Sequence, residues 1–65
     1  MIRVYKCMVK YSKGITMAMD CTVTCDNDTK IREMERDLKA AAADEFSTAL
    51  KKFTAEDIKI QLIKG

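Results

Sequence analysis

The cysteines are the side chains of this sequence best suited to chemistry, because a thiol can act as a nucleophile, a metal ligand or half of a disulfide. Three are present, and Cys21 and Cys25 fall on one face of a single predicted strand. Four residues of strand span about 13 Å, which is too far for a disulfide or for one shared zinc ion. We therefore expect no metal site and interpret the cysteines as small buried apolar side chains, with redox sensing as the alternative.

The other residue types that usually perform catalysis are absent or have simpler explanations. The chain has no histidine, the commonest general base near neutral pH. Ser12 is predicted in a turn and Ser47 on a solvated helix face, and the pair Asp26 and Asp28 is typical of a helix start rather than a metal site. Two glycines cannot build a phosphate-binding or dinucleotide-binding loop. We expect no catalytic residue and no cofactor, and hence no enzyme.

Length and composition indicate one small domain covering residues 1–65. The 65 residues are 48% apolar and 34% charged, with a formal net charge of +2. A domain of this size has a marginal core and is often reinforced by association with another subunit. No apolar run approaches the roughly 18–20 residues that span a bilayer, and no signal-peptide pattern is visible. An odd number of cysteines argues against a secreted disulfide framework, so we expect a cytoplasmic protein without membrane contact.

The clearest local pattern is an unbroken alternation of apolar and polar residues from 15 to 25, which predicts one strand with one buried face. Residues 2–11, rich in valine, tyrosine and methionine, predict a preceding strand. Between them, Ser12, Lys13 and Gly14 form a suitable three-residue hairpin loop, with Gly14 in the left-handed conformation. This loop predicts the following cross-strand pairs: Tyr11 with Ile15, Val9 with Met17, Cys7 with Met19, and Tyr5 with Cys21. A two-residue loop would bury lysines, so we exclude it.

A single helix over 29–53 is predicted to follow, starting at Asp28 or Asn27 as its N-cap. Its apolar residues recur at steps of three and four positions: Ile31, Met34, Leu38, Ala42, Phe46, Ala49, Leu50 and Phe53. At about 37 Å it would match the length of the hairpin. The alternation from Ile58 to Ile63 predicts a third strand.

The predicted fold is α+β, a β-β-α-β domain whose three-stranded sheet has the order 2-1-3, with one long helix on one face. The helix should bury the odd-numbered side chains of the hairpin: Tyr5, Cys7, Val9, Met17, Met19, Cys21 and Val23.

The sheet face opposite the helix is the main functional clue. It carries the candidate interface residues Ile2, Val4, Met8 and Ile63, and a cluster of large apolar side chains on a face expected to meet water suggests a contact surface. Small size and two free sheet edges favour self-association. We expect a non-enzymatic interaction or regulatory accessory protein, a homodimer or the partner of another protein, acting through this open face or an edge strand.

Nucleic-acid binding is the alternative. Lys6, Lys10 and Lys59 are predicted on the same open face and could follow a phosphate backbone. RNA-binding sheets also stack bases on aromatic side chains, whereas this register directs Tyr5 and Tyr11 into the core. A register shifted by one residue would expose both tyrosines and strengthen this alternative.

Overall fold

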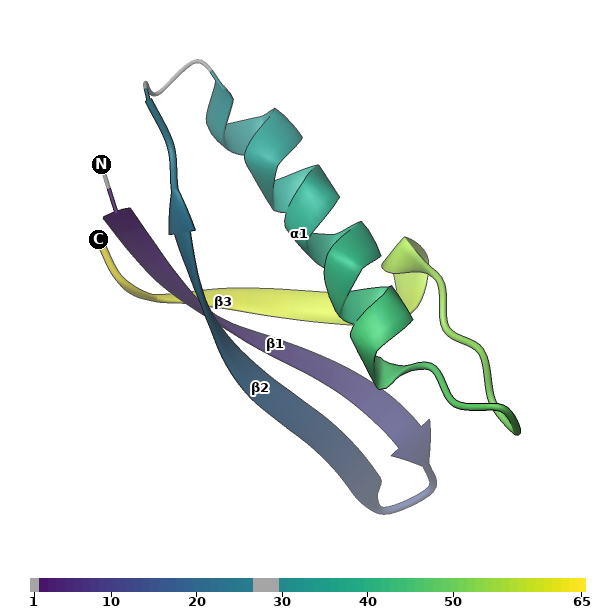
Figure 1. Cartoon of the computed structure of the whole chain (residues 1–65). Coiled ribbons are helices and arrows are strands. Elements are labelled where there is room, and N and C mark those ends of the chain that lie inside the picture. Colours follow the sequence, from purple (N-terminus) through teal and green to yellow (C-terminus); the bar gives the residue numbers. More distant parts are fainter. Residues whose placement is uncertain (1, 27–29) are drawn as a thin grey trace.

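The computed structural model of the chain describes residues 2–26 and 30–65. Its elements follow the order β1 (Ile2–Ser12), β2 (Ile15–Thr24), α1 (Ile31–Phe46), a single 3-10 turn η2 (Ala55–Asp57) and β3 (Ile58–Lys64). The three strands form one antiparallel sheet in the order β2-β1-β3, with α1 on one face (Figure 1). The predicted α+β class, element order and sheet order are therefore confirmed.

The hairpin register is the predicted one over almost its whole length. Tyr5 pairs with Cys21, and the pairing continues without a shift to Lys10 and Thr16. The predicted three-residue loop and its pair of Tyr11 with Ile15 are wrong: Ser12 belongs to β1 and pairs with Ile15, so the loop is the two residues Lys13 and Gly14. Tyr11 is the extra residue of a bulge, which restores the odd–even register and so avoids the burial of lysines expected for a two-residue loop. Gly14 has a φ of +81°, which side chains with a Cβ rarely adopt, so the turn depends on this glycine as expected.

The predicted helix is too long at its C-terminal end. α1 ends at Phe46, and Ser47 has extended backbone angles. The Ser47 hydroxyl donates a hydrogen bond to the Ala43 carbonyl at 2.7 Å and accepts one from the Phe53 amide at 2.8 Å. These bonds end the helix and fold the following loop back, so that Phe53 is buried while Leu50 is 95% exposed. The predicted N-cap, Asp28 or Asn27, lies outside the described residues.

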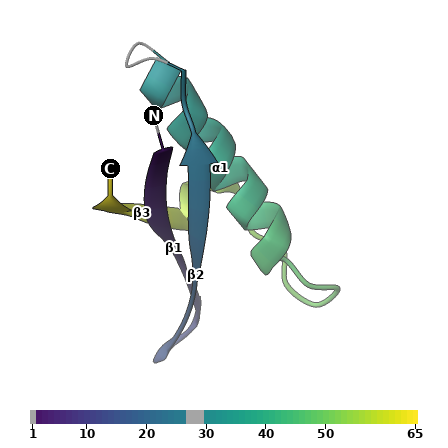
Figure 2. The same ribbon diagram turned by 60° about the vertical axis from the view of Figure 1, so that its left-hand side comes forward.

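Because α1 is shorter than predicted, it covers less of the sheet. Sixteen residues span about 24 Å, less than the hairpin, whose turn extends beyond α1 in both views (Figures 1 and 2). The helix packs mainly against η2 and β3 and less against β1, and β2 is not among its main neighbours. The core is correspondingly asymmetric, and its buried side chains are Tyr5, Cys7, Val9, Leu38, Ala42, Ala43, Phe46, Phe53 and Ile58.

The prediction that the helix buries the inward side of both hairpin strands is therefore only half right. Tyr5, Cys7 and Val9 of β1 are at most 2% exposed. The corresponding side chains of β2 remain partly exposed at the edge of the core: Met17, Met19, Cys21 and Val23. The face of each side chain was correct, but the helix does not reach far enough across the sheet to bury the edge strand.

Candidate interaction surface

The outer edge of β2 is a long strand edge without a neighbour in the sheet. β1 is the central strand, so β2 pairs on one side only over Ile15–Thr24. Natural edge strands are usually protected by lysine, proline, a bulge or a very short length. β2 contains no lysine or proline, its one charged residue is Asp20, and the hairpin bulge lies in β1. This edge is open to pairing with another strand.

An apolar row accompanies this edge on the helix side of the sheet. We call it the β2 row, and it consists of Ile15, Met17, Met19, Cys21 and Val23. Ile15 is 53% exposed, and the other four are partly buried against the core. No charged residue interrupts the row, because Asp20 points to the opposite face of the strand. Free backbone groups and apolar side chains thus lie side by side along β2.

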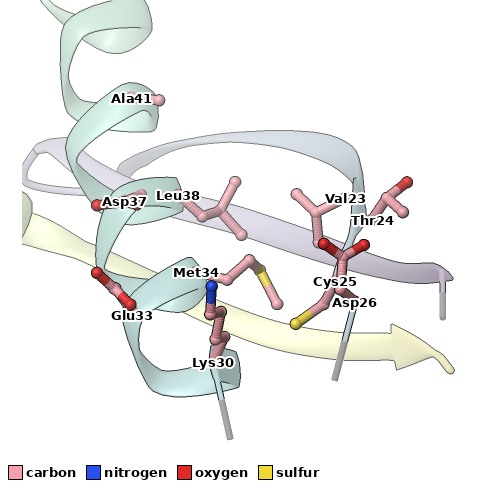
Figure 3. A pocket seen from close by; sticks show the side chains of 10 residues that line it. All are labelled: Val23, Thr24, Cys25, Asp26, Lys30, Glu33, Met34, Asp37, Leu38 and Ala41. Atoms are coloured by element: carbon pink, nitrogen blue, oxygen red, sulfur yellow. The ribbon is translucent and has the colours of Figure 1, made fainter. Parts of the chain in front are cut away.

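A groove of about 480 Å³ continues the β2 row between the end of β2 and the first turns of α1. In Figure 3, Met34 and Leu38 of α1 point across it toward Val23 and Cys25. Charged side chains line its rim: Asp26, Lys30, Glu33 and Asp37. The groove exists because α1 is displaced from β2.

The candidate interface on the open sheet face is less continuous. Ile2 is 63% exposed and Ile63 is 53% exposed, whereas Val4 and Met8 are partly buried. Ile63 lies where the β1–β3 register shifts, since Val4 pairs with Lys64 and Tyr5 with Leu62. On β1 the exposed Lys6 separates Val4 from Met8. The structure therefore places Ile2, Val4 and Met8 on the open side without forming a single apolar patch, and Ile63 has no cross-strand partner.

The lysines of the nucleic-acid alternative also occupy the open face. Lys6, Lys10 and Lys59 are all exposed, and Lys6 is the cross-strand partner of Asp20. Lys10 and Lys59 line a shallow hollow of about 300 Å³ together with Met8. No aromatic ring accompanies them. The chain has four aromatic residues, all of them described: Tyr5, Phe46 and Phe53 belong to the core on the helix side, and Tyr11 packs against it.

The two tyrosines illustrate that placement. Tyr5 is 1% exposed. The Tyr11 ring lies 6.2 Å from the Phe53 ring, with the Lys51 ammonium 5.3 Å from the Tyr11 ring centre. Neither ring can stack a base on the open face, so only phosphate contacts would support nucleic-acid binding there.

One polar link crosses from the sheet to the helix. Arg3 Nη1 donates to the Tyr5 hydroxyl at 3.1 Å, and that hydroxyl donates to Glu35 Oε2 at 2.6 Å. Burial raises the pKa of Tyr5, and the hydrogen bond to Glu35 raises it further. A neutral tyrosine that already donates to a carboxylate holds α1 on β1, and it is not poised to act as a base.

Sequence reasoning missed one pair of thiols. Cys7 Sγ lies 3.7 Å from Cys21 Sγ, and neither forms a disulfide. Burial is the main cause that raises the pKa of the Cys7 thiol to about 11. The signal was present in the predicted register, since pairing Cys7 with Met19 and Tyr5 with Cys21 makes the two cysteines diagonal neighbours.

Among the described residues, no group of three or more histidine, cysteine, aspartate or glutamate side chains could hold a metal ion. The single described helix, α1, is neither long nor apolar enough to cross a membrane. Comparison with protein-family models, with curated proteins and with solved structures gives no match.

Proposed function

We propose that this chain is a small non-enzymatic interaction protein that self-associates through β2. A second copy would add its own β2 antiparallel to the first, joining two three-stranded sheets into one of about six strands, a common sheet size. The observation that carries the proposal is the coincidence of an unprotected strand edge with the partly exposed β2 row. Main-chain hydrogen bonds would supply affinity, and the apolar row would supply the buried area.

A two-fold axis restricts how two β2 strands can pair. Opposite residues must share a face, and an axis at Asp20 would set two carboxylates against each other. An axis at Met19 avoids this clash, because Asp20 then faces Ala18 of the second copy. It also pairs Ile15 with Val23 and Met17 with Cys21, apolar against apolar along most of the strand. An axis at Cys21 would also keep the two Asp20 carboxylates apart, but it would leave the first residues of β2 unpaired. We therefore propose the register centred on Met19.

The side chains with possible chemistry are used structurally, which supports a non-enzymatic role. The Ser47 hydroxyl holds the end of α1, and Tyr5 links β1 to Glu35. A regulatory or accessory role fits a chain that offers a pairing surface and a small core. Three cysteines without a disulfide support a reducing compartment, and we propose the cytoplasm as the location.

Two isoleucines of equal exposure provide a matched test. Ile15 in the β2 row and Ile63 on β3 are both 53% exposed. Light scattering coupled to size exclusion should report a dimer for the wild-type chain and for Ile63→Lys, and a monomer for Ile15→Lys. A lysine in the paired row must lose its hydration, whereas the same change on β3 leaves it in water. Circular dichroism should show unchanged helix content in both variants.

The outcomes separate the possible surfaces. A dimer that survives Ile15→Lys but dissociates with Ile63→Lys or Ile2→Lys would place the contact on the open sheet face and refute the β2 register. A wild-type chain that stays monomeric at high micromolar concentration would refute self-association altogether.

A further inference from the structure

The thiols of Cys7 and Cys21 meet on the helix side of the hairpin. Their sulfur atoms are 3.7 Å apart. A disulfide requires roughly 2.05 Å, so the pair would have to move together to form one. The observed separation is that of a thiol–thiol hydrogen bond in which Cys7 Sγ donates to Cys21 Sγ. Two thiolates bound at roughly 2.3 Å to one three-coordinate metal lie about 4.0 Å apart, so a shared ion in place of the thiol proton would require the sulfur atoms to separate by only a few tenths of an ångström.

A third sulfur residue shares this position. Met19 is the cross-strand partner of Cys7 and lies two residues before Cys21 on the same face of β2. Cys7, Met19 and Cys21 are therefore neighbours in the sheet, two thiols and one thioether. Met19 is partly exposed and unbranched, which gives its sulfur freedom to turn toward the pair.

The chemistry of this group selects the kind of ion. Thiolates and thioethers are soft ligands that favour Cu(I), whereas Mg²⁺ and Ca²⁺ need oxygen ligands. Asp20 projects to the opposite face of β2, and the chain has no histidine, so a four-ligand zinc set is not available here. The sulfur neighbours fit a low-coordinate soft cation.

Access comes from the side that α1 leaves open. Cys7 is fully buried, but Cys21 and Met19 are partly exposed in the β2 row. An ion would meet Cys21 and Met19 first and reach Cys7 last.

We propose that Cys7 and Cys21, with Met19 as a third ligand, bind one soft monovalent cation of the Cu(I) class. Two metal–sulfur bonds form to the cysteines, two S–H bonds break, and both protons pass to solvent. No oxidation or reduction is involved. The ion would tie β1 to β2, and the site lies within one chain, so this inference does not rest on the proposed dimer.

Anaerobic titration of the reduced full-length chain with Ag(I), and with Cu(I) in competition with a chromophoric chelator, tests the proposal. We expect one ion per chain, ultraviolet absorption from thiolate-to-metal charge transfer, and a higher unfolding temperature, since binding to the folded state stabilises it. Zn(II) should give no saturable binding.

The variants assign the ligands. Cys21→Ser should weaken Ag(I) binding by more than about a hundredfold, because it removes a direct ligand, and Met19→Leu should weaken it less. Cys25→Ser is the control and should bind like the wild-type chain, and circular dichroism should show that each variant keeps its helix.

Unchanged affinity in Cys21→Ser, or loss of affinity in Cys25→Ser alone, would overturn the assignment. A wild-type chain that takes up no Ag(I) would overturn the proposal whatever the variants do.

Discussion

β1 and β2 belong to one hairpin and carry the same alternation, yet they have different roles in the fold. The inward side chains of β1 are at most 2% exposed at Tyr5, Cys7 and Val9, whereas Met17, the partner of Val9, is only partly buried. β1 has a strand on each side and α1 above it, while β2 has one neighbour and little helix cover. Alternation thus determines which way a side chain points, and position in the sheet determines how deeply it is buried.

Thiol reactivity should display this difference most strongly. In the native chain at mildly alkaline pH, iodoacetamide should modify Cys21 at least about a hundredfold faster than Cys7, a ratio that corresponds to about 2.7 kcal/mol. Cys7 is fully buried and its pKa is raised to about 11, so it requires local opening and a rare thiolate. Peptide mapping by mass spectrometry would give both rates. Equal rates, after Cys25→Ser has removed the third thiol, would show that β1 and β2 open together.

Truncation of one cross-strand pair should sharpen the comparison in terms of stability. Val9→Ala should lower the free energy of unfolding by about 2–3 kcal/mol, because Val9 is only 2% exposed and its truncation leaves a cavity in the core. Met17→Ala on the paired position should cost less than half as much, since its side chain is only partly buried. Urea unfolding at one low protein concentration measures both without a contribution from association. A larger cost for Met17→Ala would contradict the asymmetric core.

A smaller effect should appear at alkaline pH. The folded chain holds the Cys7 thiol neutral to a pKa of about 11, above its ordinary value of 9.0, and the pKa of Tyr5 is also raised. As the pH rises past 9.0, the unfolded chain loses these protons first, so stability falls through this window. The contribution is complete below pH 9.0 and lost above about 11.

Cys7→Ala should reduce this slope of stability against pH, as measured by thermal unfolding from pH 8 to about 11. The same slope in the wild-type chain and in Cys7→Ala would contradict the assignment of this pH dependence to the Cys7 thiol.

Much of the fold was predictable because it depends on local periodicity. Gly14 and the odd–even pattern determined the hairpin register as far as Lys10 and Thr16, and the strand order followed from it. The end of α1 was not predictable in the same way. Ala49 and Leu50 continue the helical spacing, but the Ser47 hydroxyl satisfies the Ala43 carbonyl and the Phe53 amide instead. A side chain that competes for backbone partners gives no signal in apolar periodicity.

The candidate surfaces show the same contrast between features that local periodicity predicts and features that depend on tertiary packing. The open-face residues Ile2, Val4 and Met8 could be assigned to their side from alternation, and the Cys7–Cys21 contact was implied by the register. The exposure of the β2 row could not be predicted from the sequence, because it depends on how far one helix reaches across three strands.

By itself the sequence determined the strands, their pairing and the side each residue faces, since these properties follow from a period of two and one turn glycine. Only the tertiary structure decided that α1 ends at Phe46 and lies over β1 and β3. The reason is that helix placement is a balance of packing among residues far apart in the chain, and that balance leaves the β2 row only partly buried.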